Sequence, residues 1–107
     1  MDQAVLEKLL TRSWRHSHEE DSGDGVTFRP EGFAFPRSRG RKGMRLDRGG
    51  GMLEISPGPG DRTQQAPGRW TIAAGPEPLL HLQPASGPAQ SFRIRSLDAD
   101  RLVLSPA

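Results

Sequence analysis

Cysteine is absent from this chain of 107 residues. Disulfides and thiolate metal sites are therefore excluded, and a reducing cytoplasm is the compartment that we expect. No apolar run approaches the ~18 residues that a membrane-spanning helix needs. The first ten residues lack the basic flank and the long apolar stretch of a secretory signal. We therefore expect a cytoplasmic protein with no membrane span.

Aromatic residues are scarce: the chain has no tyrosine, two tryptophans and four phenylalanines. The net charge is only +2, from 15 basic and 13 acidic residues. Nucleic-acid binding normally combines a strong basic patch with aromatic side chains that stack on bases, so both shortages argue against such a partner. The length predicts one domain, residues 1–107, too short for a two-domain enzyme with a dinucleotide fold.

The hydrophobic period changes at residue 12. Residues 2–11 predict a short helix, because Val5, Leu6, Leu9 and Leu10 form one apolar stripe and Asp2 can cap its start. After residue 12, apolar and polar residues alternate, which is typical of half-buried strands. Eight such segments follow, with their apolar positions at Trp14/His16/His18, Val26/Phe28, Met44/Leu46, Leu53/Ile55, Trp70/Ile72, Leu80/Leu82, Phe92/Ile94 and Leu102/Leu104.

Turn-like sequences separate these strands, which predicts an antiparallel meander. Glycine-rich residues 48–51 are suited to a tight hairpin, and residues 57–69 read as a longer loop. Closing the meander removes both exposed edges, so we expect a small all-β, up-and-down antiparallel barrel of about eight strands with a short N-terminal helix. Glu54 is predicted to be exposed, on the face opposite Leu53 and Ile55, and in the reversed register it would instead point into the barrel.

The order of landmarks resembles that of small bacterial lipocalin-like domains. The matching residues are Leu10 with Trp14, Gly49 to Gly51, Gly68 with Trp70, Leu80 with Leu82, and the set Phe92, Ile94, Leu97, Leu102 and Leu104. Arg12 departs from the pattern, which has a small residue two places before the first tryptophan. The resemblance implies a lipocalin-like barrel plugged at one end by the N-terminal segment, with a small apolar ligand.

The expected ligand site is the barrel interior. Its apolar lining is predicted to comprise Phe28, Met44, Leu46, Trp70, Leu80, Leu82, Phe92 and Ile94. In the basic run at 37–48, Arg39 and Arg41 are candidates for holding an anionic group of a ligand. The acidic stretch 19–24 and the basic stretch 37–42 both adjoin the strand at 26–29, so we expect them to lie close together at one barrel end.

His16 and His18 are the candidates for a metal site. Strand alternation places both imidazoles on the face of Trp14, and two imidazoles on one strand can hold zinc or another transition metal. The spacing fixes no third ligand, although His81 and Asp24 are available. We therefore expect no metal and no other cofactor.

Three functions remain open from the sequence. The leading one is binding of a small apolar or amphiphilic molecule, as a carrier or sensor rather than an enzyme. The second is a small barrel enzyme, either a cofactor-free cyclase or isomerase or one assisted by a metal at His16 and His18. The third is a protein-interaction or inhibitor module that uses the loop at 30–42. The oligomeric state stays open.

Overall fold

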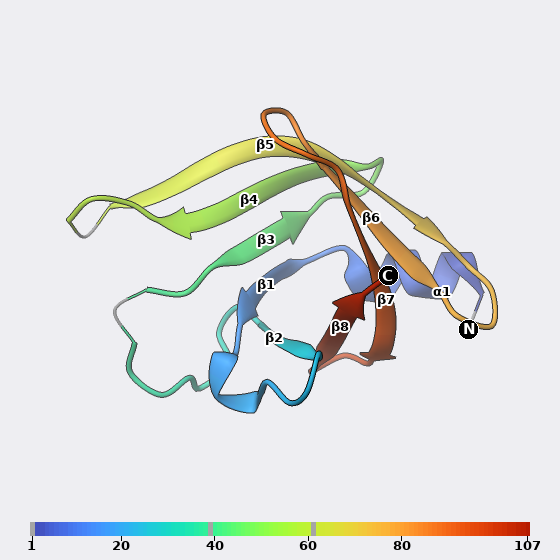
Figure 1. Cartoon of the computed structure of the whole chain (residues 1–107), viewed down its shortest axis with the longest axis horizontal. Helices are drawn as coiled ribbons and strands as arrows, with labels where there is room; N and C mark the ends of the chain where they lie inside the picture. Colours follow the sequence, from blue (N-terminus) through green and yellow to red (C-terminus); the bar gives the residue numbers. More distant parts are fainter. Residues whose placement is uncertain (1, 39, 61) are drawn as a thin grey trace.

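The computed structural model describes residues 2–38, 40–60 and 62–107, which form one short helix, one 3₁₀ turn and eight strands (Figure 1). In chain order these elements are α1 (Gln3–Leu10), β1 (Ser13–His16), η1 (His18–Glu20), β2 (Val26–Pro30), β3 (Gly43–Leu46), β4 (Gly51–Pro57), β5 (Thr63–Ala73), β6 (Leu79–Pro84), β7 (Gln90–Leu97) and β8 (Leu102–Pro106). No helix in the described ranges has the length and apolarity to cross a membrane.

The strands close into an antiparallel barrel in the order β1-β2-β8-β7-β6-β5-β4-β3, which confirms the predicted fold class. One connection departs from an up-and-down path. β1 lies between β2 and β3 and pairs with both of them. After β2 the chain therefore passes along β1 to reach β3, instead of turning back beside β2. Residues 31–42, here called the crossover segment, make this connection. These twelve residues are long enough to pass β1. The alternation of apolar and polar residues within the strands does not reveal this strand order.

Backbone hydrogen bonds tie the crossover segment to both ends of β1. The Glu31 amide donates to the Ser13 carbonyl at 3.0 Å, and the His16 amide donates to the Lys42 carbonyl at 2.8 Å. Gly43 then enters β3, where an added Cβ would meet the Trp14 carbonyl oxygen. Only glycine therefore allows β1 and β3 to approach this closely.

The core fills the barrel end that α1 covers, here called the closed end. Asp2 caps α1 by accepting a hydrogen bond from the Val5 amide at 2.9 Å. Leu6 and Leu10 are the buried face of the helix and pack in one cluster with the inner strand residues. That cluster also contains Trp14, Met44, Leu46, Met52, Trp70, Ile72, Leu80, Leu102 and Leu104.

The predicted inward face of β4 is wrong. Met52 pairs with Leu46 and Glu54 pairs with Met44, so Met52 and Glu54 share the inner face. The turn before β4, with Gly49 and Gly50 at positive φ, sets this register. Ile55 is buried on the outer face, and Glu54 is exposed as predicted although it lies on the inner face.

Two strand boundaries also differ from the prediction. β1 ends at His16, and His18 begins η1, so strand alternation does not relate the two histidines. β5 begins at Thr63, within the stretch predicted as a loop, and its first five residues pair with β4 but not with β6. The β4–β5 hairpin consequently reaches beyond its neighbours, as Figure 1 shows.

Candidate functional site

All eight predicted lining residues lie on the inner face of the barrel, but they divide into two groups. Four of them are buried in the packed core at the closed end: Met44, Leu46, Trp70 and Leu80. The other four are only partly buried and pack against that core: Phe28, Leu82, Phe92 and Ile94. A ligand can therefore contact the second group directly, whereas the first group is covered by protein atoms.

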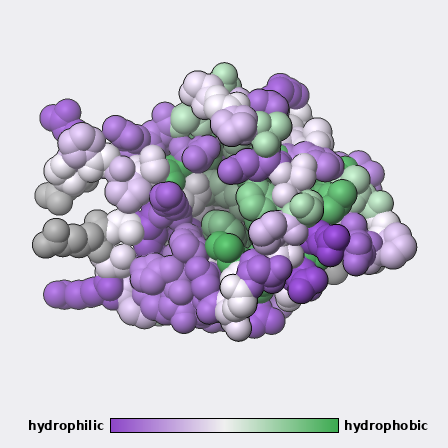
Figure 2. All heavy atoms as spheres, viewed as in Figure 1, coloured by the Kyte–Doolittle hydropathy of each residue, from purple (hydrophilic) through white to green (hydrophobic). Residues whose placement is uncertain are grey.

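The partly buried group lines the other end of the barrel, here called the open end. Phe28 comes from β2, Leu82 from β6, and Phe92 and Ile94 from β7. The rim beside them is polar, with Gln64 and Gln90 exposed. Figure 2, in the same view as Figure 1, shows apolar side chains among hydrophilic ones near the middle of the face in view. The open end is thus an apolar surface with a polar margin.

Both tryptophans serve the packing of the closed end. The indole Nε1 of Trp14 donates to the Leu10 carbonyl at 3.1 Å, and that of Trp70 donates to the Asp47 carbonyl at 2.8 Å. A buried indole needs such a partner for its N–H. The first bond joins α1 to β1 and the second joins the β3–β4 turn to β5. Trp70, a predicted ligand residue, is 4% exposed.

His16 is a polar side chain on the inner face near the open end. Its register partner is Phe28, and the two ring centroids are 5.6 Å apart. Nε2 of His16 lies 2.9 Å from Oδ2 of Asp21. Oδ1 of Asp21 accepts a hydrogen bond from the Thr27 amide at 2.9 Å, which fixes the carboxylate and with it the imidazole. The sequence pattern did not reveal the Asp21 contact, because it depends on how residues 17–25 turn back.

The histidine pair does not form a metal centre with a third ligand in the described residues. The His16 and His18 rings stand edge to face with centroids 5.9 Å apart. Each is bound to a different carboxylate, His16 to Asp21 and His18 to Glu19. No group of three metal-ligating side chains occurs within the described ranges.

Arg41 forms the first of two arginine–glutamate clamps that hold η1. Its Nη1 and Nη2 donate to the two carboxylate oxygens of Glu19 at 2.8 and 2.6 Å. The same two nitrogens donate to the carbonyls of His16 and Pro36 at 3.1 and 2.7 Å. The guanidinium also lies 4.6 Å from the centroid of Phe35. With these contacts Arg41 is a bridge between η1, β1 and the crossover segment.

Arg29 forms the second clamp in the same way. Its Nε and Nη2 donate to the two oxygens of Glu20 at 2.8 and 2.7 Å, and the Ser17 hydroxyl donates to Glu20 at 2.7 Å. Its guanidinium lies 4.7 Å from the centroid of Phe33. Phe33 packs edge-on against Phe35, so the two clamps enclose an aromatic pair of the crossover segment.

The Glu19–Arg41 contact confirms that the acidic and basic stretches meet. Arg39, the other candidate for an anionic ligand, lies outside the described residues. Arg41 remains a predicted ligand residue. Its guanidinium makes four hydrogen bonds within the protein, to Glu19 and to the carbonyls of His16 and Pro36. Sequence reasoning did not single out Arg29 and Ser17, because their contacts to Glu20 join separate segments and follow no local pattern.

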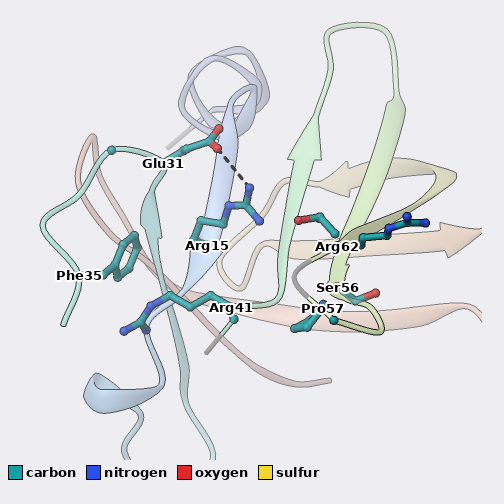
Figure 3. Close-up of a pocket in the computed structure, with 11 residues that line it drawn as sticks. Arg15, Glu31, Phe35, Arg41, Ser56, Pro57 and Arg62 are labelled. Atoms are coloured by element: carbon teal, nitrogen blue, oxygen red, sulfur yellow. Dashed lines mark hydrogen bonds and ion pairs between the residues drawn. The ribbon is translucent and has the colours of Figure 1, made fainter. Parts of the chain in front are cut away.

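A hollow of about 340 Å³ lies between the crossover segment and the β4–β5 hairpin. Arg15, Glu31, Phe35 and Arg41 line one side of it. Nη2 of Arg15 donates to Glu31 at 3.2 Å, and Figure 3 shows this pair at the edge of the hollow. In the same view Arg62 points away from Arg15. The charges on this side of the hollow are thus already paired within the protein.

The clamps predict a loss of stability in acid. The hydrogen bonds from Arg41 lower the pKa of Glu19 from 4.5 to about 2, and those from Arg29 and then Ser17 lower the pKa of Glu20 equally. In the unfolded chain both carboxyls titrate near their ordinary values, so their stabilisation is complete above pH 4.5 and is lost as the pH falls through about 2. Melting temperatures from pH 6 to pH 2 measure this loss. A Glu19→Gln/Glu20→Gln variant should show a shallower decline, and an unchanged slope would contradict the assignment.

No protein-family model, curated protein or solved structure matches this chain. The closed eight-stranded barrel with its N-terminal plug is consistent with the lipocalin-like scaffold. The candidate site therefore has to be judged from its own geometry.

Proposed function

We propose that this protein is a carrier or sensor that binds a small amphiphilic molecule at the open end of its barrel. The observation that carries the proposal is the partly buried apolar group Phe28, Leu82, Phe92 and Ile94 on the inner face. Removing apolar area from water contributes about 25 cal/mol per Å². A ligand chain that covers these side chains gains this stabilisation without displacing the packed core.

The polar margin supports an amphiphile over a purely apolar ligand. Ligand sites commonly combine an apolar lining with a few fixed polar groups that set orientation. At the open end His16 is such a group, because it is held by Asp21, whose other carboxylate oxygen accepts from the Thr27 amide. Membership of the lipocalin-like domains is part of this proposal, since the barrel and its plug follow that scaffold while fold alone does not assign a ligand.

The test uses 1-decanol as a neutral amphiphilic probe, with binding measured by calorimetry. Phe92→Ala should weaken binding about tenfold, since losing roughly 50 Å² of apolar contact corresponds to about 1.3 kcal/mol. Ser91→Ala is the matched control, because Ser91 is the preceding residue of β7 and faces outward beside His81. Circular dichroism checks that both variants fold. Equal affinity of the two variants, or no binding by the wild type, would reject the proposed function.

A further inference from the structure

The charges of the barrel are divided between its two faces. The strand register places Arg15, Arg29, Arg45, Arg69 and Arg93 on the outer face. Arg95 lies in the β7 bulge opposite the outward Val103 and is exposed. Among the inner-face positions of the described strands, Glu54 is the one carboxylate, and none is lysine or arginine. The interior thus offers a ligand no guanidinium or ammonium from the strands.

Glu54 lies at the rim of the open end. It pairs with Met44 on one side and with Ala66 on the other, and Ala66 belongs to the part of β5 that extends beyond β6. Its side chain is exposed, and no ion pair is formed by it among the described residues. Arg45, on the neighbouring strand β3, faces outward and pairs with Asp47. Glu54 therefore faces the open end as a carboxylate that has no ion-pair partner in the described part of the chain.

His16 adds a hydrogen-bond acceptor to the same end. A carboxylate only accepts hydrogen bonds, so the 2.9 Å contact to Asp21 assigns the proton of neutral His16 to Nε2. Nδ1 then carries a lone pair, and within the described residues it has no hydrogen-bond partner. The side chain of His16 is 25% exposed. The groups around it are the carboxylate of Asp21, the rings of His18 and Phe28, and the guanidinium of Arg41, which donates to the His16 carbonyl and is paired with Glu19.

From this division of charge we propose that the ligand headgroup is a hydrogen-bond donor, a primary ammonium or a hydroxyl, and not a carboxylate or phosphate. This inference rests on the proposed function and specifies its ligand. The apolar chain lies against Phe28, Leu82, Phe92 and Ile94, and the headgroup lies at the rim near Glu54 and His16. An anionic headgroup would meet Glu54 and Asp21 with no cation of the inner face to neutralise it.

The experiment compares three probes with the same ten-carbon chain at pH 7.5: decylammonium and decanoate below their micelle concentrations, and 1-decanol below its solubility limit. Calorimetry gives the affinities. We expect decylammonium and 1-decanol to bind at least tenfold more tightly than decanoate. Tighter binding of decanoate would overturn the inference while leaving the amphiphile-binding function standing. If none of the three probes binds, both the function and the inference fail.

Two variants test the named residues. Glu54→Gln should weaken decylammonium binding about fivefold, which corresponds to one charge pair at about 4 Å in a watery environment, and should leave 1-decanol unchanged. Glu77→Gln is the control, since Glu77 is an exposed carboxylate in the loop between β5 and β6. His16→Phe should weaken 1-decanol binding, and the His16 ring resonances of the wild type should shift on addition of this probe. Unchanged ring resonances and equal affinities of the Glu54 and Glu77 variants would each overturn the assignment.

Discussion

Replacing Trp14 with alanine is expected to lower the free energy of unfolding by about 3–5 kcal/mol, the cost of truncating a large buried aromatic side chain. Trp14 is fully buried and belongs to the cluster that joins α1 to the strands. A domain of this size has a total stability of about 5–15 kcal/mol, so this one change removes a large part of it.

The loss should have two components, packing and the indole hydrogen bond. Trp14→Phe retains most of the ring volume but removes the 3.1 Å bond from Nε1 to the Leu10 carbonyl. That carbonyl still accepts from the Arg12 amide at 2.8 Å, so the phenylalanine variant should lose only about 1–2 kcal/mol. Urea unfolding measures both values. A loss below about 1 kcal/mol for Trp14→Ala would show that the plug is not anchored through this residue.

The parts of the fold that were predictable are those that depend on local pattern. Alternation placed Trp14, Leu80 and Leu104 on the inner face, because each sits in a strand whose two faces differ in polarity. The helix followed from the stripe of Leu6 and Leu10. The position of β1 between β2 and β3 was not predictable, since strand order depends on pairing between distant segments.

The face of β4 was missed for a related reason. Met52, Leu53 and Ile55 are all apolar, so alternation alone allows either face to point inward. The register set by the preceding turn decides between them, and it turns Glu54 inward together with Met52. The sequence suggested the contact between residues 19–24 and 37–42 from charge, but it did not show which partners pair. The site that we propose thus combines predictable apolar positions with a carboxylate that the preferred register had placed on the outer face.

Arg41→Ala is expected to release the crossover segment and to lower the melting temperature by about 5 °C or more. The side chain is 9% exposed and satisfies two backbone carbonyls as well as Glu19, so truncation leaves all of these groups without their donor. It also removes the cation that stacks on Phe35. Arg41→Lys should recover only part of the loss, because an ammonium does not reproduce the bidentate contact.

Arg37→Ala provides the matched control for Arg41→Ala. Arg37 belongs to the same segment, carries the same charge and is exposed, so its removal should leave the melting temperature nearly unchanged. Amide hydrogen exchange gives a second measurement. The Glu31 and His16 amides form the hydrogen bonds between β1 and the two ends of the crossover segment, and both should lose protection in Arg41→Ala. Equal melting temperatures and equal protection in the two variants would mean that β1 holds this segment without the clamp. A lower melting temperature and weaker protection in Arg41→Ala than in Arg37→Ala would show that Arg41 holds the crossover segment against β1.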